Sequence, residues 1–295
     1  MKYFKSVFAS LTAMLALGSS PVAAAGTAHP ALWAVSDADT TVYLFGTIHL
    51  LPENYPWRTT KFDRAVSGSQ QLMVETIVDQ NNPHEMMQAL SSLAFSPNLP
   101  PIAERVPPEK RAALEAAIKK SGIPRQSFES METWAAAFML LGNQFKDMGL
   151  KVGEGVEIVL RNAFTTQGKQ VGQLESNREQ LGFFDTLPEP AQRALLEGAI
   201  EEPQNMSREF EAMLSSWARG DVDAIAQTFN RDLAVSPELK DALLKRRNAN
   251  WSRWVEQRMA APGSVMVAVG AGHLAGHDSV VEMLKKSGYR VRRVQ

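Results

Sequence analysis

The chain has 295 residues, of which 44% are hydrophobic, so it is long enough to bury a substantial core. Its 31 Lys and Arg residues nearly balance its 32 Asp and Glu residues, which gives no general attraction to nucleic acid or anionic lipid. The chain contains no cysteine, which excludes disulfides, thiolate nucleophiles and zinc sites built on thiolates. Any metal would have to be bound by His, Asp, Glu or carbonyl oxygen.

The N-terminal stretch is typical of a bacterial export signal. Two lysines precede an apolar run that ends at Leu17, and three alanines follow at positions 23–25. The apolar run is shorter than the roughly 20 residues that a membrane-spanning helix needs, which favours cleavage near Ala25 over anchoring. We therefore predict a signal peptide over residues 1–25, a periplasmic or secreted mature chain, and no stable membrane anchor after cleavage.

The first half of the mature chain begins with strand-like sequence and then becomes helical. Residues 32–36 and 41–45 are two short β-favouring runs separated by four turn-like residues, and they predict a hairpin. A helix over about 58–66 and a strand over 70–75 follow. Apolar residues at helical spacing then predict a helical insertion over roughly 80–150.

The second half returns twice to strand-like sequence. A strand is predicted over 169–175, and a long helical stretch opens at Ser236, which precedes a proline at the first helical position. The chain closes with a strand over 264–270, a helix over about 277–286 and a final short strand, a β-α-β arrangement that predicts parallel strands. The expected fold over residues 26–295 is one α/β domain, with a mixed, partly parallel central sheet flanked by helices.

Four predicted strands end in a residue that could take part in chemistry. These residues are His49, Glu75, Glu175 and His273. Because the carboxyl ends of parallel strands meet at one edge of a sheet, and open α/β sheets bind ligands there, we expect the four side chains to converge. Two imidazoles and two carboxylates suit Mn, Co, Fe or Zn in an open site, where bound water could be acidified into a nucleophile.

Glycines accompany both histidines. Gly46 lies three residues before His49, and Gly270 and Gly272 precede His273. We expect these glycines to turn the backbone sharply at the strand ends and to let a metal or substrate approach the main chain.

These residues resemble the TraB/PrgY/GumN family, which is related to the Tiki metalloproteases. The resemblance rests on two Gly-x-x-His motifs near the ends of the domain, and on VE, GKQVGQLESNREQ and RRNANW between them, at residues 74–75, 168–180 and 246–251. It covers nearly all of the mature chain. It implies the fold and the location of the site. For the Tiki members it also implies divalent-metal protease activity, whereas the bacterial plasmid members are known mainly as regulators of peptide pheromone.

The same resemblance directs Arg247 and Asn248 toward the site, where Arg247 would stabilise an oxyanion or bind a substrate carboxylate. On pattern alone, the two residues sit in a charged helix and could equally belong to a solvated face. The sequence GVE at 155–157 stands where Gly-Val-Asp is expected, which leaves the role of Glu157 open.

The remaining histidines and glycine-rich motifs do not indicate a second functional site. His29 is expected to be flexible beside the predicted cleavage site, and His84 and His277 are expected at the surface or at helix starts. HLAGH lacks the glutamate of the H-E-x-x-H zinc motif. The sequence GAGHLA fits the dinucleotide fingerprint loosely, but the next strand carries no acidic residue to hold a ribose.

The leading hypothesis is a divalent-metal hydrolase of peptide or related acyl bonds. In this hypothesis His49 and His273 are ligands, one of Glu75 and Glu175 is a ligand, and the other is the general base, in an order that the sequence leaves open. The expected partner is a peptide or small-molecule substrate and not nucleic acid. The alternatives are a non-catalytic peptide-binding protein that uses the same cleft, haem or iron binding through the same histidines, and a site that has decayed.

Overall fold

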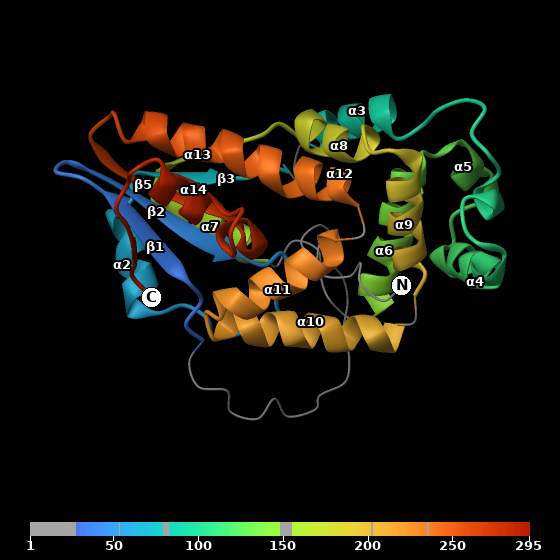
Figure 1. Cartoon of the computed structure of the whole chain (residues 1–295), viewed down its shortest axis with the longest axis horizontal. Helices are drawn as coiled ribbons and strands as arrows, with labels where there is room; N and C mark the ends of the chain where they lie inside the picture. Colours follow the sequence, from blue (N-terminus) through green and yellow to red (C-terminus); the bar gives the residue numbers. More distant parts are fainter. Residues whose placement is uncertain (1–27, 53, 79–82, 148–154, 202, 235) are drawn as a thin grey trace.

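The computed structural model describes residues 28–52, 54–78, 83–147, 155–201, 203–234 and 236–295. The signal peptide predicted over residues 1–25 lies outside this part of the chain. At the centre is a six-stranded mixed sheet with the order β4-β3-β5-β2-β1-β6 (Figure 1). Its strands are β1 Leu32–Ser36, β2 Thr40–Thr47, β3 Gln71–Val74, β4 Gln170–Gln173, β5 Gly263–Gly270 and β6 Val291–Arg293. The predicted α/β fold with a partly parallel sheet is confirmed.

Four neighbouring strands run parallel: β4, β3, β5 and β2. β1 pairs antiparallel with β2, which confirms the predicted hairpin, and it also pairs antiparallel with β6. β6 therefore runs in the same direction as β5, as a β-α-β arrangement requires, but β2 and β1 lie between them.

Helices cover both faces of the sheet and extend beyond it. The α-helices are α2 Thr60–Gly68, α3 His84–Leu93, α4 Arg111–Ser121, α5 Arg125–Ser130, α6 Thr133–Asp147, α7 Val156–Thr166, α8 Asn177–Asp185, α9 Glu189–Ala199, α10 Pro203–Ala218, α11 Val222–Leu233, α12 Pro237–Lys240, α13 Arg246–Arg258 and α14 Val280–Lys286. Short 3-10 turns are η1 Ile102–Glu104, η2 Pro108–Lys110 and η4 Ala271–Leu274, and η3 Asp241–Lys245 is a π-helical turn. Figure 1 shows α3, α4, α5, α6, α8 and α9 gathered at one end of the molecule, away from the hairpin.

The sheet is buried on both faces because its strands alternate apolar side chains between two cores. In β5, Val265, Val267 and Val269 face one core, which α13 and α14 cover with residues such as Trp251 and Leu284. The intervening side chains of β5, at 266 and 268, face the second core, which contains residues of α2, α7 and the outlying helices. The period of two follows from strand geometry.

Several helices begin at side-chain caps that the sequence encodes. Ser236 accepts a hydrogen bond from the backbone N–H of Leu239 with Pro237 at the first helical position, as predicted. Ser176 and Glu179 form a capping box at the start of α8, which fixes the chain directly after Glu175.

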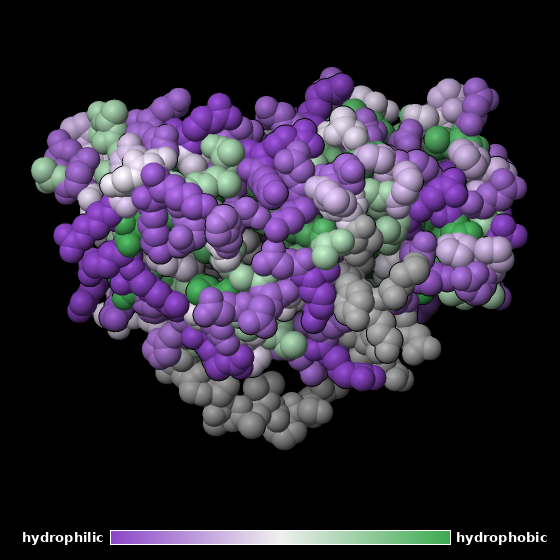
Figure 2. All heavy atoms as spheres, viewed as in Figure 1, coloured by the Kyte–Doolittle hydropathy of each residue, from purple (hydrophilic) through white to green (hydrophobic). Residues whose placement is uncertain are grey.

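The face in Figure 2 is largely hydrophilic, with small separate apolar areas. None of the helices in the described ranges combines the length and the apolar content needed to cross a membrane.

Candidate active site at the carboxyl edge of the sheet

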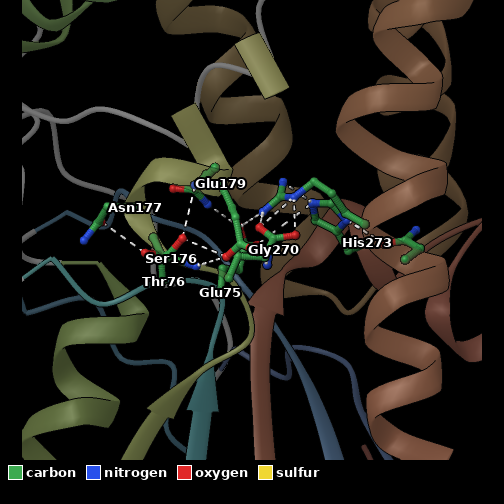
Figure 3. Close-up of polar contacts among 11 residues, drawn as sticks. Glu75, Thr76, Ser176, Asn177, Glu179, Gly270 and His273 are labelled. Atoms are coloured by element: carbon green, nitrogen blue, oxygen red, sulfur yellow. Dashed lines mark hydrogen bonds and ion pairs between the residues drawn. The ribbon is translucent and has the colours of Figure 1, made fainter. Parts of the chain in front are cut away.

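The parallel strands end close to one another in register, β3 and β4 opposite Ala268 of β5 and β2 opposite Gly270, and this brings the predicted site residues together. Val74, the last residue of β3, pairs with Ala268 of β5 and with Gln173 of β4, and Thr47 of β2 pairs with Gly270 of β5. Glu75, Glu175, His49 and His273 each follow within three residues of their strand's end. Figure 3 shows Glu75, Gly270 and His273 beside one another at this edge, next to the start of α8.

Glu75 is a buried carboxylate held from several sides. Its Oε1 accepts a hydrogen bond from the backbone N–H of Gly270 at 2.6 Å, and its Oε2 accepts one from Nη2 of Arg247 at 2.7 Å. Nε2 of Gln180 lies 3.3 Å from the same Oε2 atom. Burial alone raises the pKa of a carboxyl group, but the Arg247 guanidinium, the nearby histidines and the Gly270 N–H outweigh it and hold the pKa of Glu75 at about 2.

The segment after Glu75 is fixed by Asn177 at the start of α8. Thr76 donates its hydroxyl to Oδ1 of Asn177 at 3.1 Å, and Nδ2 of Asn177 donates to the carbonyl of Ile77 at 3.1 Å (Figure 3). The Asn177 side chain is buried, so these bonds are sheltered from water. They place Glu75 relative to α8 and therefore relative to Glu175.

Glu175 is the second carboxylate of the pair. Nε of Arg247 lies 3.1 and 3.0 Å from its two carboxylate oxygens, and Nη2 lies 2.8 Å from Oε2. Burial raises the pKa of Glu175, the Arg247 charge opposes that effect, and the neighbouring Glu75 charge adds to it. One guanidinium therefore serves two buried carboxylates, whose pKa values are shifted in opposite directions.

Arg247 lies at the centre of the site and contacts three of the four predicted residues. Besides both glutamates, its Nη1 lies 3.2 Å from Nε2 of His273. Its guanidinium carbon lies 4.7 Å from the ring centroid of Trp251 and 5.6 Å from that of Phe183. Burial lowers the pKa of Arg247, but the two carboxylates reverse this and raise it, so the side chain is a permanent cation.

The helix that carries Arg247 has an unusual start. The π-helical turn η3 ends at Lys245 and continues directly into α13, whose second residue is Arg247, and such turns frequently occur at functional sites. Arg247, Trp251, Val255 and Met259 recur every four residues and are all buried. This spacing is the sequence signal that Arg247 faces the core and not the solvent, and reasoning from charge alone missed it.

The Asn248 side chain fixes the tautomer of His273. Nδ2 of Asn248 donates to the carbonyl of Asp278 at 2.7 Å, so its Oδ1, 2.6 Å from Nδ1 of His273, is the acceptor. Nδ1 therefore carries the ring proton, and Nε2 presents a lone pair to Arg247. Burial and the Arg247 charge lower the pKa of His273 to about 3, which keeps the ring neutral.

His49 is oriented in a similar way by Glu157. Its Nδ1 lies 2.9 Å from Oε1 of Glu157, and the Thr47 hydroxyl also donates to that oxygen. Burial lowers the pKa of His49, but the Glu157 carboxylate outweighs it and raises the pKa above the ordinary value. The side chain of His49 is 26% exposed, whereas that of His273 is 8% exposed, so His49 lies nearer the protein surface. The role that the sequence left open for Glu157 is thus contact with His49.

Gly155 explains how α7 approaches His49 closely. A Cβ atom at Gly155 would lie 2.3 Å from the backbone oxygen of His49, and the next residue, Val156, donates its N–H to the carbonyl of Ile48 at 3.2 Å. Glycine is therefore required at this position for close approach and not for an unusual φ, which is −68°.

The glycines of the two Gly-x-x-His motifs act partly as predicted. Gly270 ends β5, and the chain then enters the turn η4, which contains Gly272. Gly46 lies inside β2 with no left-handed φ, so the sharp turn predicted there is wrong. Its Cβ would lie 3.0 Å from Cα of Ala271, so this glycine instead allows η4 to pack closely on β2.

The other histidines lie apart from this site. His29 and His84 are exposed, and the His277 side chain is 84% exposed. Among the residues that the structure describes, His49 and His273 are thus the histidines at the carboxyl edge of the sheet.

The donor atoms fit a divalent cation in type and in charge. Two imidazoles and two carboxylates are suitable ligands, and with both carboxylates ionised the core of the site carries +1 from Arg247 and −2 from Glu75 and Glu175, a net −1. Within the described ranges, no three His, Asp or Glu side chains stand in ligand geometry for a metal ion. The Arg247 guanidinium instead contacts the atoms that would bind it.

Comparisons with known proteins assign the chain to a family. The sequence model of the TraB/PrgY/gumN family matches residues 31–293, and the chain belongs to this family. Among curated proteins, it is similar to the uncharacterized protein YbaP of Escherichia coli (strain K12), with 26% identity over 247 residues that cover 82% of this chain and 87% of the relative. The uncharacterized protein YbaP of Shigella flexneri matches to the same extent. No solved structure matches the chain significantly.

Proposed function

We propose that this protein is a divalent-metal-dependent hydrolase of peptide or related acyl bonds. The observation that carries the proposal is shared by the two histidines. Nδ1 of His49 is held by Glu157 and Nδ1 of His273 by Asn248, so Nε2 is the nitrogen of each ring that remains to bind a metal, and in His273 that nitrogen now contacts Nη1 of Arg247. Metal-binding histidines usually have their other ring nitrogen fixed in this way.

The pKa directions separate the roles of the two carboxylates. Glu75, with a pKa of about 2, is ionised at neutral pH and is a weak base, so it suits a ligand better than a proton acceptor. The pKa of Glu175 is raised, which suits a group that accepts a proton from water and returns it to a leaving group. His49 Nε2, His273 Nε2 and Glu75 would hold the metal, and Glu175 would be the general base.

Asn248, Glu157 and Arg247 would orient the two histidines and stabilise the charge that develops in the reaction. A bound divalent ion would lower the pKa of a water molecule and polarise a carbonyl group. Asn248 and Glu157 keep the two imidazoles in the required tautomer and orientation. Arg247 provides a fixed positive charge for the oxyanion that develops when an acyl bond is attacked.

The test is hydrolysis of a peptide library by the purified protein. We expect cleavage that a chelator abolishes, that Mn²⁺, Co²⁺ or Zn²⁺ restores, and that His49→Ala and His273→Ala each reduce by at least about a hundredfold. His277→Ala is the matched control, because this exposed imidazole lies outside the site. Hydrolysis that persists with the chelator and in both variants would contradict the proposal. Peptide binding without cleavage in chelated protein would favour the binding alternative.

We also propose that the protein acts outside the cytoplasm. The support is the sequence of residues 1–25, with its two lysines, its apolar run and its three alanines at positions 23–25. Cell fractionation and the mass of the purified chain test this. A full-length chain retained in the cytoplasm would contradict it.

A further inference from the structure

We infer that Arg247 is an internal cation that competes with the metal ion, and that the site must release Arg247 from His273 before the metal can bind there. This inference rests on the proposed metal site, but it concerns a different event, the exchange of one cation for another. The Arg247 side chain is only 5% exposed and its guanidinium contacts Glu75, Glu175 and His273 together.

The imidazole of His273 makes the competition strict. With the ring proton on Nδ1, Nε2 has a single lone pair, and that lone pair already accepts from Nη1 of Arg247 at 3.2 Å. A zinc ion bound to this nitrogen would lie about 2.0–2.1 Å away along the same direction, in the space that the guanidinium occupies. The two contacts therefore exclude each other.

The carboxylates differ from the imidazole in this respect. Each has about four acceptor positions, so Glu75 and Glu175 can accept from Arg247 and still offer an oxygen to a second cation. The smallest change that admits a metal ion is thus loss of the contact between Nη1 and Nε2, with the Arg247 contacts to Glu175 retained. Nη1 would then be a charged donor without a protein partner, facing the reacting group.

Arg247 also explains how the site can be folded without a metal. Two neighbouring buried carboxylates without a counter-charge are strongly destabilising. Arg247 supplies that charge and is packed near Trp251 and Phe183. Some small metal-binding domains, such as zinc fingers, fold only when their metal binds. This protein should therefore fold both with and without the metal ion. Its metal affinity should be lower than it would be without Arg247, because Arg247 competes for the same atoms.

The experiment is Zn²⁺ binding by calorimetry to chelator-treated protein, with the wild type and Arg247→Met. Methionine removes the charge and the donors but keeps an unbranched side chain of similar length. We expect Arg247→Met to bind Zn²⁺ about ten- to a hundredfold more tightly than the wild type. We also expect Zn²⁺ to raise its melting temperature by more than it raises that of the wild type.

Arg246→Met is the matched control. Arg246 is the preceding residue of α13, its side chain is 57% exposed, and it pairs with Asp241 outside the site. Its loss should leave Zn²⁺ affinity unchanged within about twofold. Equal or weaker Zn²⁺ binding by Arg247→Met than by the wild type would overturn the inference.

A crystal structure of the wild type with Zn²⁺ decides the matter even if Arg247→Met does not fold. We expect zinc on Nε2 of His273 and Nη1 of Arg247 moved out of contact with it, and a zinc-loaded structure that keeps this contact overturns the inference. Tighter Zn²⁺ binding by Arg247→Met without any hydrolysis by the wild type would support the inference and remove the proposed function. Metal-dependent hydrolysis by the wild type, with no gain of Zn²⁺ affinity in Arg247→Met, would support the proposed function and overturn the inference.

Discussion

Oδ1 of Asn248 lies 2.6 Å from Nδ1 of His273, and this contact determines which nitrogen of the ring carries the proton. The adjacent residue on the same helix, Arg247, contacts the opposite nitrogen of the same ring. Two consecutive residues of α13 thus fix both the tautomer and the orientation of a single imidazole.

Replacing Asn248 tests this relationship. Asn248→Leu leaves Nδ1 of His273 and the carbonyl of Asp278 without partners, so we expect metal affinity and kcat/KM to fall by about ten- to a hundredfold. Asn248→Asp keeps an acceptor for Nδ1 and should lose less. Asn250→Leu is the control, because Asn250 is exposed on the same helix. Unchanged affinity in Asn248→Leu would show that the tautomer does not depend on this contact.

Replacing Glu157 should lower the pKa of His49. The folded pKa of His49 is raised above 6.5, so the pair with Glu157 stabilises the fold fully below pH 6.5, and this contribution is lost as the pH rises through the folded pKa. We expect the melting temperature of Glu157→Gln to fall below that of the wild type at pH 6 and to approach it at pH 9. Titration of the His49 ring by NMR gives the pKa directly. Glu157→Asp, which keeps the charge, should retain part of the shift, and an identical His49 titration in wild type and Glu157→Gln would refute the assignment.

Glu75 should contribute to acid unfolding. Its pKa falls from 4.5 to about 2, so its ionised form stabilises the protein above pH 4.5, and that contribution is lost as the pH falls through about 2. The shift corresponds to roughly 3 kcal/mol, since each pKa unit is about 1.4 kcal/mol. Urea unfolding at several pH values should show a free-energy difference between wild type and Glu75→Gln that is constant above pH 5 and shrinks toward pH 2. A difference independent of pH would mean that the Glu75 carboxyl is not shifted.

Gly155→Ala should displace the backbone at His49. The added Cβ would lie 2.3 Å from the His49 carbonyl oxygen, and backbone atoms cannot yield as a flexible side chain can. We expect a loss of about 1–3 kcal/mol in the free energy of unfolding, together with reduced activity. Gly182→Ala in α8 is the control, because an added Cβ there would meet nothing within 4 Å. Replacing a glycine inside a helix with alanine raises the free energy of unfolding by about 0.5–1 kcal/mol. Equal stability of the two variants would show that α7 does not need this close approach.

The sequence was sufficient to predict the sheet and the edge at which the site lies. Short runs of apolar, β-favouring residues define β2 and β5, and their parallel pairing brings the residues after each strand together. The centre of the site was not predictable in the same way. The charge pattern makes Arg247 one of several charged residues in a helix. The family resemblance directed it toward the site, and within the pattern itself its four-residue spacing from Trp251 indicates burial. Glu157 lies at the start of α7, far from His49 in the sequence. Nothing in its local sequence shows that it contacts His49.

Because η3 leads into α13, a change in chain length before Arg247 affects the site differently from a change after α13. An α-helix advances about 100° per residue, so a single deletion within Asp241–Lys245 would rotate Arg247 and Asn248 by about a quarter of a revolution relative to α12. A deletion after Arg258, at the far end of α13, leaves that angle untouched. A change in length before the Arg-Asn pair should therefore turn both side chains away from the sheet edge, whereas a change after Arg258 acts only through the packing of Met259 and the connection to β5. The segment from α12 to Arg247 should accordingly keep a fixed length.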